Sequence, residues 1–165
     1  EKGAEVDLLG NAALMIASMR GHVEVCRMLL EKDPRTDHAD NKVGDTLMIA
    51  SRNGHAEVCR MLLEKGAGVD HAGKDEGTAL MIASRLGHVE LCRMLLEKDP
   101  RTDHADNKVG DTLMIASRNG HVQVCRMLLE TGAGVDHAGA SGQTALLLAS
   151  RNGHVEVCRM LLEKG

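Results

Sequence analysis

The sequence of 165 residues contains no Phe, Tyr or Trp and only two prolines. Without aromatic rings it lacks the stacking platforms that bind nucleic-acid bases, and its formal net charge of -4 provides no basic field for phosphates. No stretch approaches the roughly 18 consecutive apolar residues of a membrane-spanning helix, and the acidic residues 1–7 do not resemble a secretory signal. These absences argue against a nucleic-acid partner and against a membrane protein.

The residues that are present are sufficient for a folded domain. Apolar residues make up 43% of the chain and charged residues 27%, a balance typical of one globular domain at this length. Because aromatic side chains are missing, Leu, Ile, Val, Met, Ala and Cys must fill the core. Such a core favours many small, regular contacts.

The dominant pattern is a repeat of 33 residues. A Gly-His pair recurs with this period, and a cysteine follows each histidine by four residues. The histidines and cysteines are His22, His55, His88, His121 and His154, and Cys26, Cys59, Cys92, Cys125 and Cys158. This period is typical of repeats that contain a turn and two helices. A second period of 66 residues, in which residues 98–121 repeat residues 32–55 unchanged, indicates recent duplication or deliberate design.

Each repeat is expected to contain two helices. In the second repeat, a short apolar helix should begin near Thr46 and end before Gly54, which supplies a left-handed turn. A second helix should start at His55, because Cys59 and Leu62 then lie on one buried face. The spacing therefore predicts five helix pairs.

The polar segments before the first helices predict β-hairpin-like loops, here called fingers, at the start of the last four repeats. Residues 37–45 are one example, and the corresponding loop of the first repeat is expected to be abbreviated. In two repeats Asp45 and Asp111 stand where the first helix should open. An aspartate there can cap the first turn, so we expect both residues to be caps.

The last repeat resembles the ankyrin repeat most closely, with a Gly-x-Thr opening, a Leu-x-x-Ala helix and a Gly-His pair. The matching residues are Gly142, Thr144, Leu146, Ala149, Gly153, His154, Cys158, Leu161 and Leu162. Departures are systematic, since Ala or Thr replaces the family's proline and Met or Leu its first histidine. The resemblance covers the whole chain and implies an all-α solenoid of helix-turn-helix repeats joined by fingers. One domain over 1–165 is expected, with repeats near 1–33, 34–66, 67–99, 100–132 and 133–165.

The histidines and cysteines do not predict a metal site. They lack zinc-type spacing, and equivalent residues on helices packed about 8 to 10 Å apart cannot share one ion. We expect Cys26 and its equivalents to be buried free thiols, which favours a reducing, intracellular location, namely the cytoplasm. The Gly-His histidines should make local hydrogen bonds at the start of the second helix, and His38 and His71 should brace the fingers.

No catalytic centre is expected. A nucleophile, its base and an orienting group must form a singular arrangement, whereas every candidate here recurs once per repeat with the same neighbours. The glycines stand singly at turns and not in phosphate-binding loops. The sequence therefore predicts a non-enzyme without a cofactor.

Comparison of the repeats separates a nearly invariant frame from varied places at the finger tips and at the ends of the first helices. In ankyrin proteins these places line the concave groove, so they predict a binding surface for a protein or peptide. The predicted residues are Met19, Arg20, Asn41, Lys42, Arg52, Asn53, Lys74, Asp75, Glu76, Arg85, Leu86, Asn107, Lys108, Arg118, Asn119, Ser141, Arg151 and Asn152. The arginines would form a ladder suited to acidic groups, and the equally open alternative is that they are merely solvated.

Two functions follow from this pattern. The first is a protein-interaction scaffold that binds its partner along the groove and finger tips. The alternative is a structural or engineered repeat array that assembles head to tail, because Leu8, Leu9 and Ile16 at one end and Leu161 and Leu162 at the other have no polar cap. The sequence leaves natural and engineered origins both open.

Overall fold

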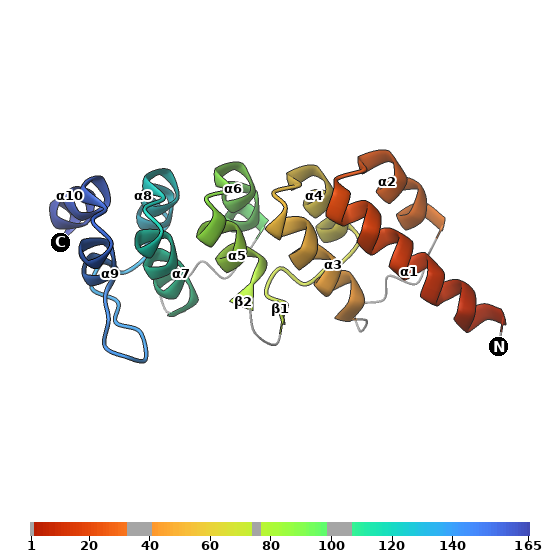
Figure 1. Cartoon of the computed structure of the whole chain (residues 1–165), viewed down its shortest axis with the longest axis horizontal. Coiled ribbons are helices and arrows are strands. Elements are labelled where there is room, and N and C mark those ends of the chain that lie inside the picture. The colour runs from red at the N-terminus through yellow and green to blue at the C-terminus, as the bar shows by residue number, and fades with distance from the viewer. Residues whose placement is uncertain (1, 33–40, 74–76, 99–106) are drawn as a thin grey trace. The chain divides into compact units, whose positions relative to one another are not determined.

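The computed structural model describes residues 2–32, 41–73, 77–98 and 107–165 (Figure 1). These ranges contain ten helices and one two-stranded sheet, and none of the helices in them is long and apolar enough to cross a membrane. Residue contacts cluster in two compact parts, here called the N-terminal half (Glu1–Ile82) and the C-terminal half (Ala83–Gly165). Each half is built from pairs of antiparallel helices, as the 33-residue period predicts.

The N-terminal half begins with two helix pairs and continues into a finger. Its helices are α1 (Lys2–Arg20), α2 (Val23–Lys32), α3 (Asn41–Arg52) and α4 (Ala56–Glu64). Helix α1 packs against α2 and α3, and α3 packs against α4. The finger pairs β1 (Ala72–Gly73) with β2 (Gly77–Thr78) antiparallel, with Ala72 opposite Thr78.

The C-terminal half repeats this arrangement. Its elements are the end of α5 (Ala79–Leu86), then α6 (Val89–Lys98), α7 (Asn107–Arg118), α8 (Val122–Glu130), α9 (Ala145–Arg151) and α10 (Val155–Lys164). Helix α7 packs against α8 and α9, while α10 packs against α8 and α9, and α6 against α8. The first helices of successive repeats therefore lie in one layer and the second helices in another.

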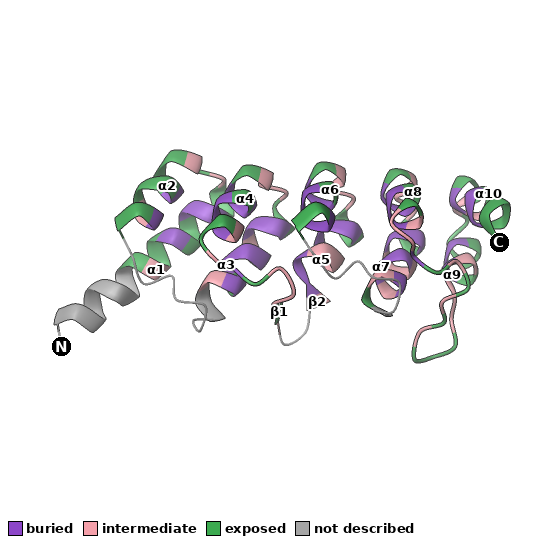
Figure 2. Ribbon diagram, turned by 180° about the vertical axis from the view of Figure 1, so that it is seen from behind, coloured by how far each residue is buried: buried purple, intermediate pink, exposed green. Residues whose placement is uncertain are grey.

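The core lies where the two helices of a pair face each other (Figure 2). In the fourth repeat, Leu113 from α7 and Val124, Cys125 and Leu128 from α8 have no exposed surface. Full burial of one such leucine stabilises the fold by about 1.5 to 3 kcal/mol. A serine of the first helix adds a polar contact inside each pair, for example Ser117 Oγ to Cys125 Sγ at 3.5 Å. The predicted burial of the cysteines is confirmed for four of them, and Cys158 is half-buried.

The turn between paired helices also follows the prediction. Gly54 has a φ of +72°, and its N–H donates to Ser51 O at 3.2 Å, so the chain reverses within two residues. The second helix then begins at Ala56, one residue after the predicted start at His55.

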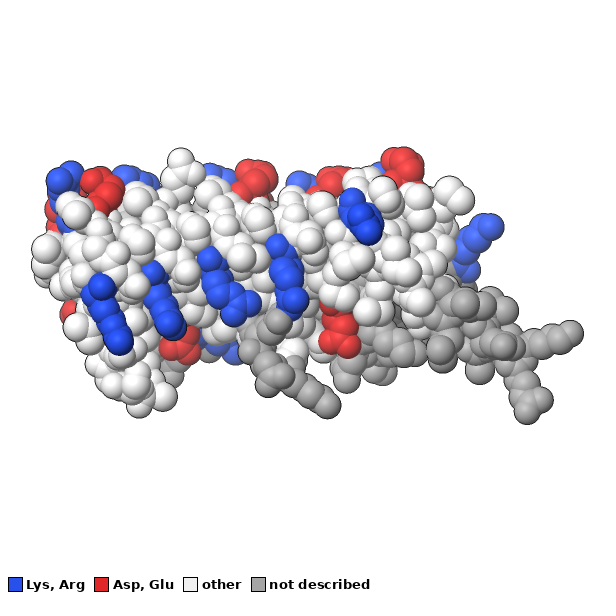
Figure 3. Space-filling view, viewed as in Figure 1, with Lys and Arg blue, Asp and Glu red and all other residues white. Residues whose placement is uncertain are grey.

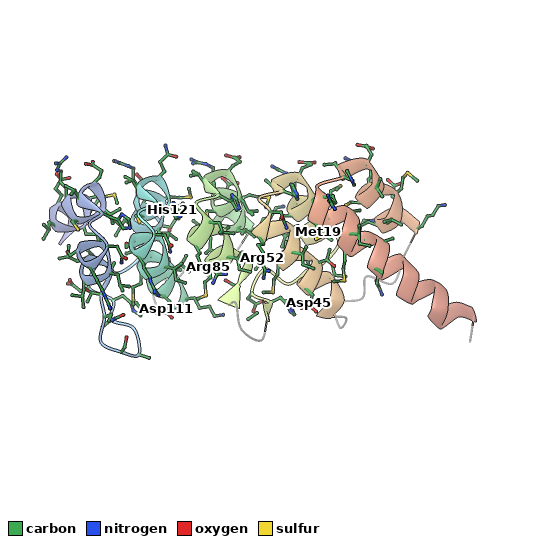
Figure 4. All side chains as sticks on the ribbon, in the orientation of Figure 1. Met19, Asp45, Arg52, Arg85, Asp111 and His121 are labelled. Atoms are coloured by element: carbon green, nitrogen blue, oxygen red, sulfur yellow. The ribbon has the colours of Figure 1, made fainter. Side chains whose placement is uncertain are left out.

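The first helices of the second and fourth repeats are longer than predicted. Helices α3 and α7 start at Asn41 and Asn107, so residues 41–45 and 107–111 are helical and do not form a finger. Asp45 and Asp111 therefore lie inside the helices, and their predicted role as caps is wrong. Figure 4 labels both residues within the helical ribbons.

The fingers that the structure describes belong to the third and fifth repeats. There a glycine with positive φ, Gly77 or Gly142, stops a helix from extending, and the hydroxyl of Thr78 or Thr144 accepts a hydrogen bond from a first-turn N–H. In the fifth repeat a single bridge joins Ala138 to Thr144. Segments 37–40 and 103–106, with His38, and Lys74, Asp75 and Glu76 lie outside the described residues.

The start of the chain differs in the same direction. Helix α1 is continuous from Lys2 to Arg20, so the abbreviated loop predicted for the first repeat is replaced by helix. The segment contains no proline and its glycines do not adopt positive φ, so nothing in the backbone interrupts the helix.

Candidate partner-binding surface

Three arginines recur at the ends of the first helices in the C-terminal half. Arg85, Arg118 and Arg151 occupy the last turns of α5, α7 and α9, and all three are exposed. Basic side chains recur over these helices in the space-filling view (Figure 3). We call these three residues the arginine row. Among the residues that the structure describes, none of them forms an ion pair or a side-chain hydrogen bond.

The arginines of the second helices have a different environment. In four repeats the guanidinium group contacts a glutamate three residues earlier, which neutralises its charge locally. These pairs are Arg27–Glu24 at 3.6 Å, Arg60–Glu57 at 3.4 Å, Arg93–Glu90 at 3.9 Å and Arg159–Glu156 at 2.9 Å. In the fourth repeat Gln123 replaces the glutamate, so Arg126 lacks this pair. The two layers of helices thus present arginines of opposite availability.

Histidines of the Gly-His pairs connect each arginine position to the next repeat. His121 Nε2 donates to Arg85 O at 2.9 Å, and His154 Nε2 donates to Arg118 O at 3.0 Å. In the N-terminal half, His55 makes the same bond to Met19 O at 3.1 Å. These carbonyls lie at helix ends and lack an intrahelical donor, so the imidazoles satisfy them.

The predicted local role of these histidines is therefore wrong. Their side chains do not cap the second helices, although they occupy the N-cap position. They reach back 36 residues instead, and each fixes the helix end that carries an arginine-row residue or its equivalent. Figure 4 labels Arg85 and His121 on these elements.

Glycines make room for the histidine rings. A Cβ added at Gly87 would lie 2.6 Å from His121 Nδ1, and one at Gly120 would lie 2.5 Å from His154 Nδ1. Both glycines also have positive φ, near +75°. The glycine, the ring and the carbonyl therefore form one unit that sets the position of each helix end relative to the next repeat.

The asparagines beside the arginines have a local role that the sequence did not indicate. The Nδ2 groups of Asn53, Asn119 and Asn152 donate to the carbonyl four residues earlier, at 2.7 to 2.8 Å, and so close the first helix. Leu86 stands at this position in the third repeat and is 43% exposed. In the first repeat the exposed Met19 and Arg20 occupy these two positions.

The finger residues of the predicted surface are not all at finger tips. Ser141 is exposed at the tip of the loop closed by the Ala138–Thr144 bridge, as predicted. Lys108 is exposed in the first turn of α7. The side chains of Asn41, Lys42 and Asn107 lie outside the described part of the structure, although their backbones are helical.

Two histidines bind the aspartates of the long first helices. His71 Nε2 is 2.9 Å from Asp45 Oδ1, and His137 Nε2 is 2.8 Å from Asp111 Oδ1. Each ring lies against a glycine of the same helix turn, so the base of one repeat's finger is held against the preceding first helix. Asp111 is thereby engaged by a histidine.

The thiols are not suited to catalysis. Burial raises the pKa of Cys59 and Cys125 to about 11 and also raises the pKa of Cys92, so these thiols stay protonated at neutral pH. Across the residues that the structure describes, no group of three or more His, Cys, Asp or Glu side chains could hold a metal ion. The histidines and aspartates instead make the structural contacts given above.

Paired helices in layers, joined by left-handed glycine turns and occasional fingers, define a tandem helix-pair repeat protein. The sequence matches the family model described as ankyrin repeats (3 copies) over residues 1–72, 34–106 and 102–165, which together span the chain. The chain therefore belongs to the ankyrin-repeat family, and the predicted family and all-α fold class are confirmed. No match to a curated protein was found. Ankyrin repeats are in general non-catalytic modules of protein–protein interaction.

Proposed function

We propose that this chain binds a protein or peptide partner with acidic groups at the ends of its first helices, with the arginine row at the centre of the surface. The observation that carries the proposal is the contrast between the two sets of arginines. The row is exposed and without an ionic partner among the described residues, whereas four second-helix arginines are already paired with glutamate. Guanidinium groups that await a carboxylate are suited to recognition.

Rigidity supports the same surface. The histidine bonds fix the backbone at Arg85 and Arg118 to the following repeat, so the row is held in place before a partner arrives. A preorganised surface loses less conformational entropy on binding. The remaining predicted surface residues stay a prediction: Met19, Arg20, Asn41, Lys42, Arg52, Asn53, Lys74, Asp75, Glu76, Leu86, Asn107, Lys108, Asn119, Ser141 and Asn152.

A pair of matched variants tests the proposal without a known partner. The row variant carries Arg85→Ala, Arg118→Ala and Arg151→Ala, and the control carries the same changes at Arg93, Arg126 and Arg159 of the second helices. Both lose three positive charges from the same half. Proteins retained by the wild-type chain should be lost by the row variant and kept by the control, as measured by quantitative mass spectrometry. Equal losses in both, with unchanged melting curves, would exclude this surface.

Apolar exposure in the outer repeats favours a second candidate function, head-to-tail self-association. Ile16 and Met28 are 58% and 59% exposed in the first repeat, and Val155 and Leu162 are 69% and 66% exposed in the last. Such heterologous contacts build rings or filaments. Light scattering over a wide concentration range should detect long species if this activity is present, whereas a constant mass near 17.7 kDa would exclude it for this chain.

We also infer a reducing compartment, the cytoplasm, from the cysteines. Cys26, Cys59, Cys92 and Cys125 are free and fully buried, so oxidation would disturb the core. Fluorescence microscopy of the tagged chain, with thiol labelling of the recovered protein, would test both the compartment and the redox state.

A further inference from the structure

The arginine row has a regular spacing that a partner must match. Helix α7 packs directly against α9, and the His121 and His154 bonds join each row residue to the next repeat. Packed helices have axes about 8 to 10 Å apart. The row therefore presents one guanidinium group about every 8 to 10 Å along the C-terminal half.

Among regular backbone conformations, polyproline II matches this spacing with few residues. It has three residues per turn and rises about 3.1 Å per residue, so every third side chain lies on the same face about 9 Å from the last. An α-helix would need six or seven residues for the same distance. In a β-strand, residues three apart point to opposite faces. A partner with acidic residues at every third position of a polyproline II segment thus meets each arginine in turn.

Charge on the same helices favours carboxylates over other contacts. Among the residues of α5, α7 and α9, Asp111 is the sole acid, and its carboxylate already binds His137. It lies two helical turns from Arg118, at the opposite end of α7. The row is therefore the local site of positive charge in a chain whose formal net charge is -4.

We propose that the arginine row binds an acidic protein segment in the polyproline II conformation, with Asp or Glu at every third residue. This inference rests on the proposed function and specifies the partner of the same surface. Polyproline II is a major conformation of unfolded chains, so an otherwise disordered acidic segment would need little rearrangement to bind. Each carboxylate would accept two parallel hydrogen bonds from one guanidinium group.

Two peptides of identical composition test the spacing. The spaced peptide is Glu-Pro-Pro repeated three times, and the clustered peptide has three Glu followed by six Pro, with both ends blocked in each. They have the same charge and the same backbone preference. Isothermal titration of the full chain should give an affinity for the spaced peptide at least about fivefold higher than for the clustered one. Equal affinities would overturn the spacing argument.

The variants described above locate the site. Binding of the spaced peptide should weaken about tenfold in the row variant, since each exposed pair contributes a factor of a few, and should change less than twofold in the second-helix control. Equal weakening in both variants, or binding of a nine-nucleotide RNA as tight as that of the spaced peptide, would reduce the interaction to net charge and overturn the proposal.

The outcomes separate this inference from the proposed function. If neither peptide binds while the row variant still loses the proteins that the wild-type chain retains, the surface stands and its acidic polyproline II partner does not. If the row variant retains those proteins as well, the proposed function fails with it.

Discussion

Replacement of Gly120 by alanine is the sharpest test of how each histidine fixes the adjacent repeat. The added Cβ would lie 2.5 Å from His154 Nδ1, so the ring must move. Moving it sacrifices the bond to Arg118 O, which contributes about 0.5 to 1.5 kcal/mol. The φ of +75° adds roughly 1 to 2 kcal/mol for a residue with a Cβ. We expect Gly120→Ala to lower the free energy of unfolding by about 2 to 3 kcal/mol.

A double-mutant cycle isolates the contribution of the ring. In the His154→Ala background, the substitution at Gly120 should cost only the backbone term, because the added Cβ no longer meets the imidazole. Gly153→Ala is the matched single control, since Gly153 has φ of +74° and no atom within 4 Å of an added Cβ. Urea unfolding followed by circular dichroism gives each value. Equal losses for Gly120→Ala in the two backgrounds would refute the reasoning.

Three further predictions concern the helix ends and the thiols. Leu86→Asn should raise the free energy of unfolding by about 0.5 to 1.5 kcal/mol in urea titrations, because it gives α5 the carboxamide bond of the other first helices, and Leu86→Ala should give no such gain. Stability should fall between pH 9 and about pH 11, because the folded state keeps the Cys59 and Cys125 protons that the unfolded state releases, and constant urea midpoints over that window would contradict this. Cys92→Asp should destabilise the fold by several kcal/mol, since it buries a charge at a fully buried site, and an unchanged melting temperature would disprove that burial.

The repeat period predicted the local structure well where local chemistry decides it. The second helix of the second repeat begins within one residue of its predicted start, because a positive-φ glycine and an apolar stripe determine that boundary. The start of α3 was missed because Asp45 resembles a cap. Its carboxylate binds His71, 26 residues away, and no local pattern indicates such a contact.

The same distinction applies to the candidate surface. The positions of the arginines, and the glutamates three residues before the second-helix arginines, can be found from helical spacing alone. The reach of His121 to Arg85 O spans 36 residues and depends on how repeats pack. The role of Asn119 had a usable signal, because an asparagine directly before the glycine that ends a helix can donate back to the last turn.

The alternation of long and short first helices has a consequence for how such chains can grow. Helices α3 and α7 have 12 residues, while α5 and α9 have 8 and 7. Each long helix holds an aspartate whose histidine belongs to the short repeat that follows. Inserting or deleting a single 33-residue repeat would separate an aspartate from its histidine, whereas a step of 66 residues keeps every such pair together. The heritable building block of this architecture is therefore the pair of repeats.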